Sequence, residues 1–297
     1  PPVLHLVSPE TWLPLSVFPL LVAGPCAAES ERQVMETAVG LAAIPEVKVF
    51  RAGIWKPRTR PGAFEGVGRE GLRWMQRVKS ETGLLTTVEV ANPRHVMEAL
   101  EFGIDILWIG ARTVVNPFSV QEIGEALGGS DIPVMVKNPL NPDLATWLGG
   151  IERLNSLGIR KLVAIHRGFS FFARTPYRNA PMWEIPIELK RLCPSLPVLV
   201  DPSHICGNRE GLPATVQKAF DLEMNGMMIE VHHHPPSALT DKNQQITPAK
   251  LALLLKSIVL RRETGSKEFS DNLEKLRSEI DKLDEELIDI LARRMKV

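Results

Sequence analysis

Cysteine, tyrosine and net charge are scarce in this chain. Its 297 residues include three cysteines and one tyrosine, and 35 Lys and Arg residues balance 35 Asp and Glu residues. Three cysteines do not make a disulfide framework, so a reducing compartment is favoured and we expect a cytoplasmic protein. Without net charge there is no overall field to attract nucleic acid or a membrane surface, and neither is expected as a partner.

Long apolar runs are also missing. No stretch reaches the length that crosses a bilayer, and prolines interrupt the opening segment, so residues 1–19 are expected to form an extended arm. The chain instead contains eight short apolar runs separated by longer amphipathic segments. The runs are 20–26, 47–53, 83–90, 104–112, 132–138, 161–168, 196–204 and 226–232. This alternation predicts an α/β fold, a closed TIM (β/α)8 barrel over residues 20–260.

Polar residues cluster where these runs end. In such barrels the active site lies at the carboxyl ends of the strands. The residues at or just beyond those ends are Cys26, Arg51, Lys56, Glu89, Arg112, Lys137, His166, Arg167, His204 and Glu230. Cations and metal-binding groups gathered at one rim predict an active site there.

Five of these residues are cations: Arg51, Lys56, Arg112, Lys137 and Arg167. Left unpaired at one concave rim they would repel one another, which predicts an anionic ligand with phosphate and carboxylate groups. The alternative is that each cation pairs with a nearby carboxylate. That alternative is disfavoured because the strand ends supply only Glu89 and carboxylates that are themselves candidate metal ligands.

A thiol, an imidazole and two carboxylates come from Cys26, His204, Glu230 and Asp241. The first and eighth strands of a closed barrel are neighbours, so these groups can converge. Such a mixed set suits manganese, iron, cobalt or zinc and suits magnesium or calcium poorly. Of the three consecutive histidines at 232–234, at most one can face the site, because adjacent side chains of a strand point to opposite faces.

The last part of the chain differs in character. Residues 261–270 are polar and predict a linker. Residues 271–297 carry apolar side chains at spacings of three and four, which predicts a long amphipathic helix with Ser270 or Asp271 as its N-cap. One such helix cannot bury its apolar stripe alone, so it needs a partner surface. A coiled-coil helix that mediates oligomerisation is one interpretation.

Several segments together resemble a known family. GPC (24–26), RAGIWKPRT (51–59), GAR (110–112), DPSH (201–204), IEVH (229–232) and ALTD (238–241) are similar to type I beta 3-deoxy-D-arabino-heptulosonate 7-phosphate (DAHP) synthases. The resemblance covers roughly residues 20–260. It implies a transferase that joins phosphoenolpyruvate to erythrose 4-phosphate and releases phosphate, the first step of the shikimate pathway to aromatic amino acids. A divalent metal, manganese before iron, cobalt or zinc, is implied as cofactor.

The resemblance also implies roles for individual residues. The metal ligands would be Cys26, His204, Glu230 and Asp241. Phosphoenolpyruvate would be bound by Arg51, Lys56, Gly110, Ala111, Arg112, Lys137 and Arg167, and erythrose 4-phosphate by Lys56, Pro57, Arg58 and Thr59. Lys56, Lys137 and His204 are the catalytic candidates, and the choice of Lys137 or His204 as proton relay stays open. His166 departs from the family, where Glu or Leu often precedes the Arg-Gly pair.

The tail resembles the first helix of an AroQ-type chorismate mutase, with Arg277 and Arg294 at the positions of two substrate-binding arginines. These residues are about 25 Å and about 100° apart on one helix, so they cannot bind one small molecule together. Since the chain ends at Val297, the mutase is expected to be incomplete and inactive. In a full-length form, chorismate or prephenate would act as effector. A homodimer or higher homo-oligomer is expected.

Two rival functions remain. One is 3-deoxy-D-manno-octulosonate 8-phosphate synthase, which uses a similar barrel but typically carries a KAN-type motif where this chain has KPRT, residues 56–59. The KPRT segment favours erythrose 4-phosphate. The other is a barrel without activity that acts as scaffold or sensor for a mutase partner. The complete set of candidate ligands and cations argues against that interpretation.

Overall fold

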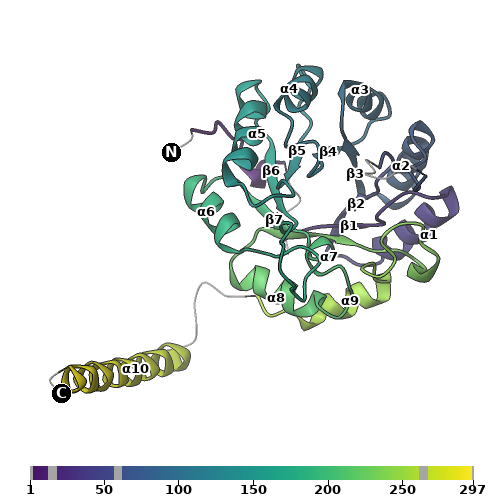
Figure 1. Cartoon of the computed structure of the whole chain (residues 1–297). Helices are drawn as coiled ribbons and strands as arrows, with labels where there is room; N and C mark the ends of the chain where they lie inside the picture. Colours follow the sequence, from purple (N-terminus) through teal and green to yellow (C-terminus); the bar gives the residue numbers. More distant parts are fainter. Residues whose placement is uncertain (1–2, 13–18, 57–61, 261–266, 296–297) are drawn as a thin grey trace. The chain divides into compact units, whose positions relative to one another are not determined.

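The computed structural model describes residues 3–12, 19–56, 62–260 and 267–295 (Figure 1). The chain divides into two compact units, Pro1–Val259 and Leu260–Val297. In the first unit eight parallel strands pair in sequence order, and β1 also pairs with β8, so the sheet is a closed barrel as predicted. The strands are β1 (Leu20–Gly24), β2 (Val47–Arg51), β3 (Leu85–Val90), β4 (Ile106–Ile109), β5 (Val134–Lys137), β6 (Leu162–His166), β7 (Val198–Val200) and β8 (Gly226–Glu230).

Helices surround the strands in Figure 1. They are α1 (Glu31–Ala42), α2 (Arg69–Thr82), α3 (Pro93–Glu101), α4 (Pro117–Ala126), α5 (Leu144–Ser156), α6 (Glu184–Leu192), α7 (Pro202–Cys206), α8 (Leu212–Asp221) and α9 (Pro248–Ser257), with short 3-10 turns at η1 (Pro9–Thr11) and η2 (Pro235–Ser237). Their starts follow from local chemistry. Ser30, Asn92, Asn116, Asp143 and Thr247 each accept a hydrogen bond from a free backbone N–H of the helix that follows.

The strands divide their apolar side chains between two cores. Leu21 and Leu107 belong to the layer between strands and helices. Their neighbours Val22 and Trp108 belong to a second cluster that fills the barrel interior. Because successive side chains of a strand point to opposite faces, every second residue faces the interior.

The second unit contains α10 (Lys267–Arg294). The predicted N-cap at Ser270 or Asp271 is wrong, since both residues lie inside α10. Lys, Glu and Phe precede Ser270, and nothing in that sequence prevents a helix from continuing through them. Leu276, Ile280, Leu283 and Leu287 on this helix are all more than half exposed. In the described part of the chain, no helix combines the length and the apolar character needed to span a bilayer.

An aromatic stack ties the segment after β2 to α3. The rings of Trp55 and His95 lie 4.0 Å apart and nearly parallel. His95 Nδ1 accepts a hydrogen bond from the backbone N–H of Ala91 at 3.3 Å, which requires an unprotonated nitrogen. Burial, together with the charge of Arg94, lowers the pKa of His95 to about 4.

This stack predicts a loss of stability in acid. The folded-state pKa of His95 lies below the unfolded value, so the unfolded chain takes up the proton first and stability falls as pH drops from about 6.5 to about 4. His95→Phe keeps a stacking ring that cannot titrate, and should remove about 1 to 2 kcal/mol of that loss after solvent screening. Urea unfolding across this pH range measures it, with exposed His5→Phe as control. Equal pH dependence in all three proteins would contradict the prediction.

Candidate active site

The carboxyl ends of the strands direct several predicted residues to one mouth of the barrel. Val49 and Met228 belong to the interior cluster. Arg51 and Glu230 follow them by two residues, at the ends of β2 and β8, and so point to the same side. Lys137 follows the interior residue Met135 in the same way. The strand alternation therefore places these charged groups where the barrel opens.

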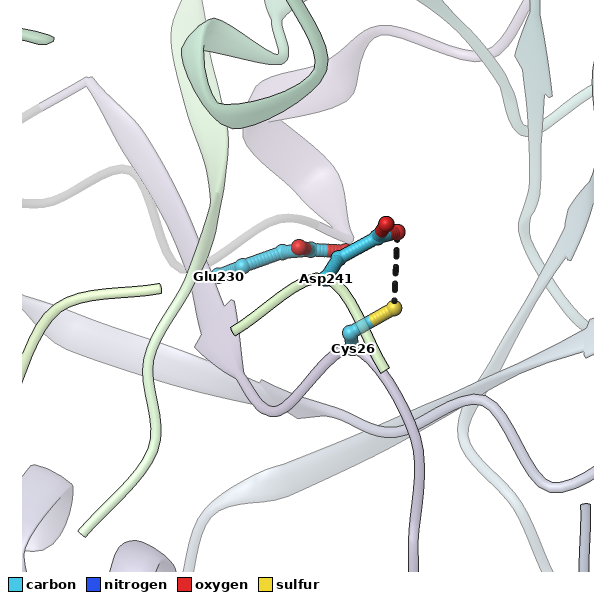
Figure 2. Close-up of side chains that lie close together, drawn as sticks. All are labelled: Cys26, Glu230 and Asp241. Atoms are coloured by element: carbon cyan, nitrogen blue, oxygen red, sulfur yellow. Dashed lines mark hydrogen bonds between the residues drawn. The ribbon is translucent and has the colours of Figure 1, made fainter. Parts of the chain in front are cut away.

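Cys26, Glu230 and Asp241 form a compact cluster at this mouth. One potential ligand atom from each lies within 4.8 Å of the others (Figure 2). The pairing of β1 with β8 sets Gly24 opposite Glu230, which brings Cys26 close to Glu230. The Cys26 thiol donates a hydrogen bond to Asp241 Oδ2 at 3.4 Å, drawn as the dashed line in Figure 2. Asp241 has a φ of +45°, a left-handed conformation that non-glycine residues adopt at some cost.

His204 borders this cluster without belonging to the compact group of three. Its Nε2 lies 3.8 Å from Glu230 Oε1, and its Nδ1 lies 2.8 Å from Asp201 Oδ2. Asp201 also caps α7, because its Oδ1 accepts a hydrogen bond from the His204 backbone N–H at 3.0 Å. Asp201 therefore orients the ring so that Nε2 is the nitrogen toward Glu230.

The electrostatics of the cluster fit a divalent cation. Burial and the nearby Glu230 raise the pKa of Cys26 to about 12, so the thiol keeps its proton unless a positive charge arrives. Burial alone would raise the pKa of Asp241, but Arg178 and other cations outweigh it and lower the pKa to about 2. Glu230 Oε1 is buried and accepts no hydrogen bond from any described residue. A thiol and two carboxylates match the preferences of a borderline divalent metal.

A cavity of about 100 Å³ opens beside the cluster. It is lined by Lys56, Glu89, Gly110, Ala111, Arg112, Lys137, Leu140, Arg167, Arg178, His204 and Asp241. Most predicted substrate residues thus share one cavity with two of the predicted metal ligands. Arg51 does not line it, because its side chain is buried deeper, over the Trp108 ring.

Two glycines make room for charged side chains. A Cβ on Gly53 would lie 2.9 Å from Lys56 Nζ, and that nitrogen donates hydrogen bonds to Cys26 O at 3.0 Å and Cys26 Sγ at 3.3 Å. A Cβ on Gly110 would lie 2.0 Å from Glu89 Oε1. Lys56 can therefore fold over Cys26, and Glu89 can lie against the backbone of β4. Pro57, Arg58 and Thr59 lie outside the described residues.

The prediction that the cations lack carboxylate partners is wrong for Lys137. Its Nζ lies 2.7 Å from Asp201 Oδ2, with both side chains almost fully buried. Arg51 Nη2 lies 3.4 Å from Glu230 Oε1, a carboxylate already considered as a ligand. Asp201 directly follows β7. A search for carboxylates at the carboxyl ends of the strands should therefore have included it as a partner for Lys137.

Three arginines, Arg112, Arg167 and Arg178, form a positive group in the cavity wall. Arg112 is exposed and has no ion pair with any described residue. Burial lowers the pKa of Arg167 to about 10, and the like charges of Arg178 and Arg112 contribute to the shift. Arg167 Nη1 donates to Asn179 Oδ1 at 2.8 Å instead of to a carboxylate. An anion bound in the cavity would relieve this repulsion.

Arg178 and Asn179 were missed by the sequence argument. Arg178 Nη1 lies 3.0 Å from Asp241 Oδ1, and Asn179 Nδ2 donates to the His204 carbonyl at 2.6 Å. Both residues lie in the long loop between β6 and α6, far from any strand end. No periodicity marks them. The antiparallel bridge between Phe169 and Ala180, and backbone hydrogen bonds from Arg178 to Cys206 and from Asn179 to Ile205, return this loop to the mouth.

The sequence matches the DAHP synthetase I family over residues 18–263. The chain belongs to this family. A phospho-2-dehydro-3-deoxyheptonate aldolase from Thermotoga maritima is 31% identical over 226 residues, which cover 76% of this chain and 64% of that relative. The chain thus spans somewhat less than two thirds of this relative's length. A crystal structure of a Thermotoga maritima DAHP synthase superposes with a TM-score of 0.75 at 27% identity, covering 91% of this chain and 77% of that one.

Relatives named for another reaction are also similar to this chain. A 2-dehydro-3-deoxyphosphooctonate aldolase from Desulfatibacillum aliphaticivorans is 29% identical over 267 residues, covering 83% of this chain and 93% of the relative. The family match ends before α10, and none of these comparisons shows a mutase. The predicted barrel and the family resemblance are confirmed, whereas the roles of individual residues stay predictions.

The buried Lys137 to Asp201 pair predicts an asymmetric effect of mutation. Asp201→Asn keeps the cap of α7 but leaves the buried Lys137 charge uncompensated, which should lower the free energy of unfolding by about 3 to 5 kcal/mol. Adding Lys137→Met should restore part of that loss. Urea titration measures it, with Glu188→Gln of the exposed Arg191 pair as control, which should change the free energy of unfolding very little. A loss in Asp201→Asn no larger than in the control would disprove this account.

Proposed function

We propose that this chain catalyses the condensation of phosphoenolpyruvate with erythrose 4-phosphate to give DAHP and inorganic phosphate. One observation carries the proposal. The cavity has Arg112, Lys137 and Arg167 in its wall, and it borders the cluster of thiol and carboxylates that suits a divalent cation. Membership of the DAHP synthetase I family supports the same reaction.

The proposed reaction has a simple balance. The methylene carbon of phosphoenolpyruvate attacks the aldehyde carbon of erythrose 4-phosphate and forms the new C–C bond. Water adds to the former enol carbon, and the bond from that carbon to the phosphate oxygen breaks. One phosphoenolpyruvate, one erythrose 4-phosphate and one water thus give DAHP and phosphate.

The residues of the cavity have separable tasks in this proposal. Arg112 and Arg167 bind the phosphate and carboxylate of phosphoenolpyruvate, since their planar donors match both groups. Lys137 adds a charge held in place by Asp201. Fixing the two reactants in one orientation removes much of the entropy cost of the encounter. Lys137 and His204 both contact Asp201, so the two candidates for proton relay share one carboxylate.

Cys26, His204, Glu230 and Asp241 would hold the metal, with manganese as first choice. A divalent metal bound there would supply Lewis-acid polarisation of the aldehyde carbonyl. Lys56 lies against Cys26 through its Nζ, and its charge helps to balance the thiolate that metal binding requires. Glu89 and Leu140 complete the wall beside Gly110 and Ala111.

Turnover of the purified 297-residue chain tests this proposal. Manganese-loaded protein should consume phosphoenolpyruvate only when erythrose 4-phosphate is present, and chelation should abolish turnover reversibly. Cys26→Ser should lower the affinity for transition metals and abolish most of the turnover, because it removes the only sulfur among the proposed ligands. Buried Cys193→Ser, in the short segment after α6, serves as control. Full activity in excess chelator would rule out the metal centre.

The choice of aldose is a separate prediction. Arg58 is expected to bind the phosphate end of erythrose 4-phosphate, so Arg58→Ala should raise the KM for this substrate by about 10-fold or more, the equivalent of a charge-assisted hydrogen bond. The KM for phosphoenolpyruvate should change far less. Steady-state kinetics with erythrose 4-phosphate and arabinose 5-phosphate measure both. Preference for arabinose 5-phosphate would instead favour the reaction named for the octonate relatives.

The assignment of α10 as a chorismate mutase helix remains a proposal. Arg277 and Arg294 are exposed on this helix, as is its apolar stripe. A surface that needs partners agrees with both the mutase and the coiled-coil interpretation. Regulation by chorismate or prephenate, the oligomeric state and a cytoplasmic location belong to the same set of proposals.

A further inference from the structure

Two consecutive glutamines, Gln244 and Gln245, lie behind the Cys26, Glu230 and Asp241 cluster. They follow β8 in the loop that carries Asp241, and both are almost completely buried, with exposed fractions of 1% and 0%. Buried amides must find hydrogen-bond partners, because an unpaired one is costly. Each of these amides finds its partners at a different member of the cluster.

Gln244 connects the two carboxylates. Its Nε2 donates to Glu230 Oε2 at 2.7 Å, and its Oε1 accepts from Arg178 Nη1 at 2.8 Å. The same Arg178 nitrogen donates to Asp241 Oδ1 at 3.0 Å. One oxygen of each carboxylate is therefore fixed from behind. The other oxygens remain at the centre, Asp241 Oδ2 beside the Cys26 thiol and Glu230 Oε1 without a hydrogen bond from any described residue.

Gln245 connects the backbone of Cys26 to the loop that carries Asp241. Its Oε1 accepts from the Cys26 backbone N–H at 3.0 Å, and its Nε2 donates to the Thr240 carbonyl at 2.7 Å. Arg209 holds the same loop through the carbonyls of Lys242 and Gln245, both at 2.6 Å. A single side chain thus spans the gap between the backbone of Cys26 and the residue before Asp241.

We infer that Gln244 and Gln245 are positioning residues that set the affinity and the ligand arrangement of the metal centre. The inference rests on the metal centre of the proposed function. Gln244 holds one oxygen of Glu230 directly and one oxygen of Asp241 through Arg178, and Gln245 fixes the separation of the sulfur from Asp241. Groups that orient metal ligands in this way typically change metal affinity by about 10- to 100-fold when removed.

Cobalt(II) binding to the metal-free full chain tests the inference without any turnover assay. A thiolate bound to cobalt gives a charge-transfer band in the near ultraviolet, so the spectrum reports on Cys26 directly, and competition with a chelator gives the Kd. Gln244→Met and Gln245→Met keep side-chain length and remove the hydrogen bonds of the side-chain amides. Each should raise the Kd for cobalt by about 10- to 100-fold. Gln245→Met should also shift or weaken the thiolate band, since it frees the Cys26 backbone.

A matched control comes from Gln217 on α8, which bonds to Asp221 and to the Val259 carbonyl at 2.9 Å each, away from the cluster. Gln217→Met should leave both Kd and band unchanged. Thermal unfolding of the metal-free proteins reports on folding. If either methionine variant fails to fold, Gln244→Glu and Gln245→Glu replace them. Gln245→Glu keeps an acceptor for the Cys26 N–H, so it should retain the band position while weakening affinity.

The outcomes separate this inference from the proposed function. Cys26→Ser must abolish the thiolate band. If the unaltered protein shows no such band, the metal centre is wrong and the inference with it. If the unaltered protein shows the band and folded Gln244 and Gln245 variants bind cobalt as tightly as Gln217→Met, only the inference is overturned.

Discussion

Closure of the barrel by the pairing of β1 with β8 is the constraint on which the rest of the molecule depends. It places Gly24 opposite Glu230, although more than two hundred residues separate them in the chain. Cys26 then lies beside Glu230, and the loop after β8 returns Asp241 to the same place. A bridge between Ala27 and Gly53 extends the contact to the segment that carries Lys56. An open sheet would leave these groups at opposite edges.

This convergence buries charged side chains at the mouth of the barrel. Arg51 pairs with Glu230, and Lys137 pairs with Asp201, all with little or no solvent exposure. Buried ion pairs contribute little net stability because desolvation offsets their attraction. Arg51 Nε and Nη1 have no hydrogen-bond partner among the described residues. Such an arrangement is poor as a source of stability and well suited to binding charged ligands.

Strand alternation explains how much could be predicted from the sequence. The eight apolar runs predicted the barrel. The grouping of His166 with the residues of the mouth was wrong, because strand parity turns Lys137 and Glu230 to the interior and leaves His166 outside, among Trp147, Phe169 and Trp183. Asp201 was quoted in a motif yet given no role, although it directly follows β7 and so lies at the same mouth as its partner Lys137. Arg178 and the two glutamines lie in loops without periodicity, where only the folded chain reveals their neighbours. The start of α10 was misplaced because a favourable cap residue can also lie inside a helix.

The positive group of Arg112, Arg167 and Arg178 also has a kinetic meaning. The cavity wall has five cations, Lys56, Arg112, Lys137, Arg167 and Arg178, against the two carboxylates Glu89 and Asp241, so it carries an excess of positive charge although the whole chain is neutral. Diffusing anions then experience an attraction that is directional although the protein carries no net charge. Because salt screens electrostatic attraction beyond about 8 Å at physiological ionic strength, the cavity attracts an anion only after the anion has come within about that distance.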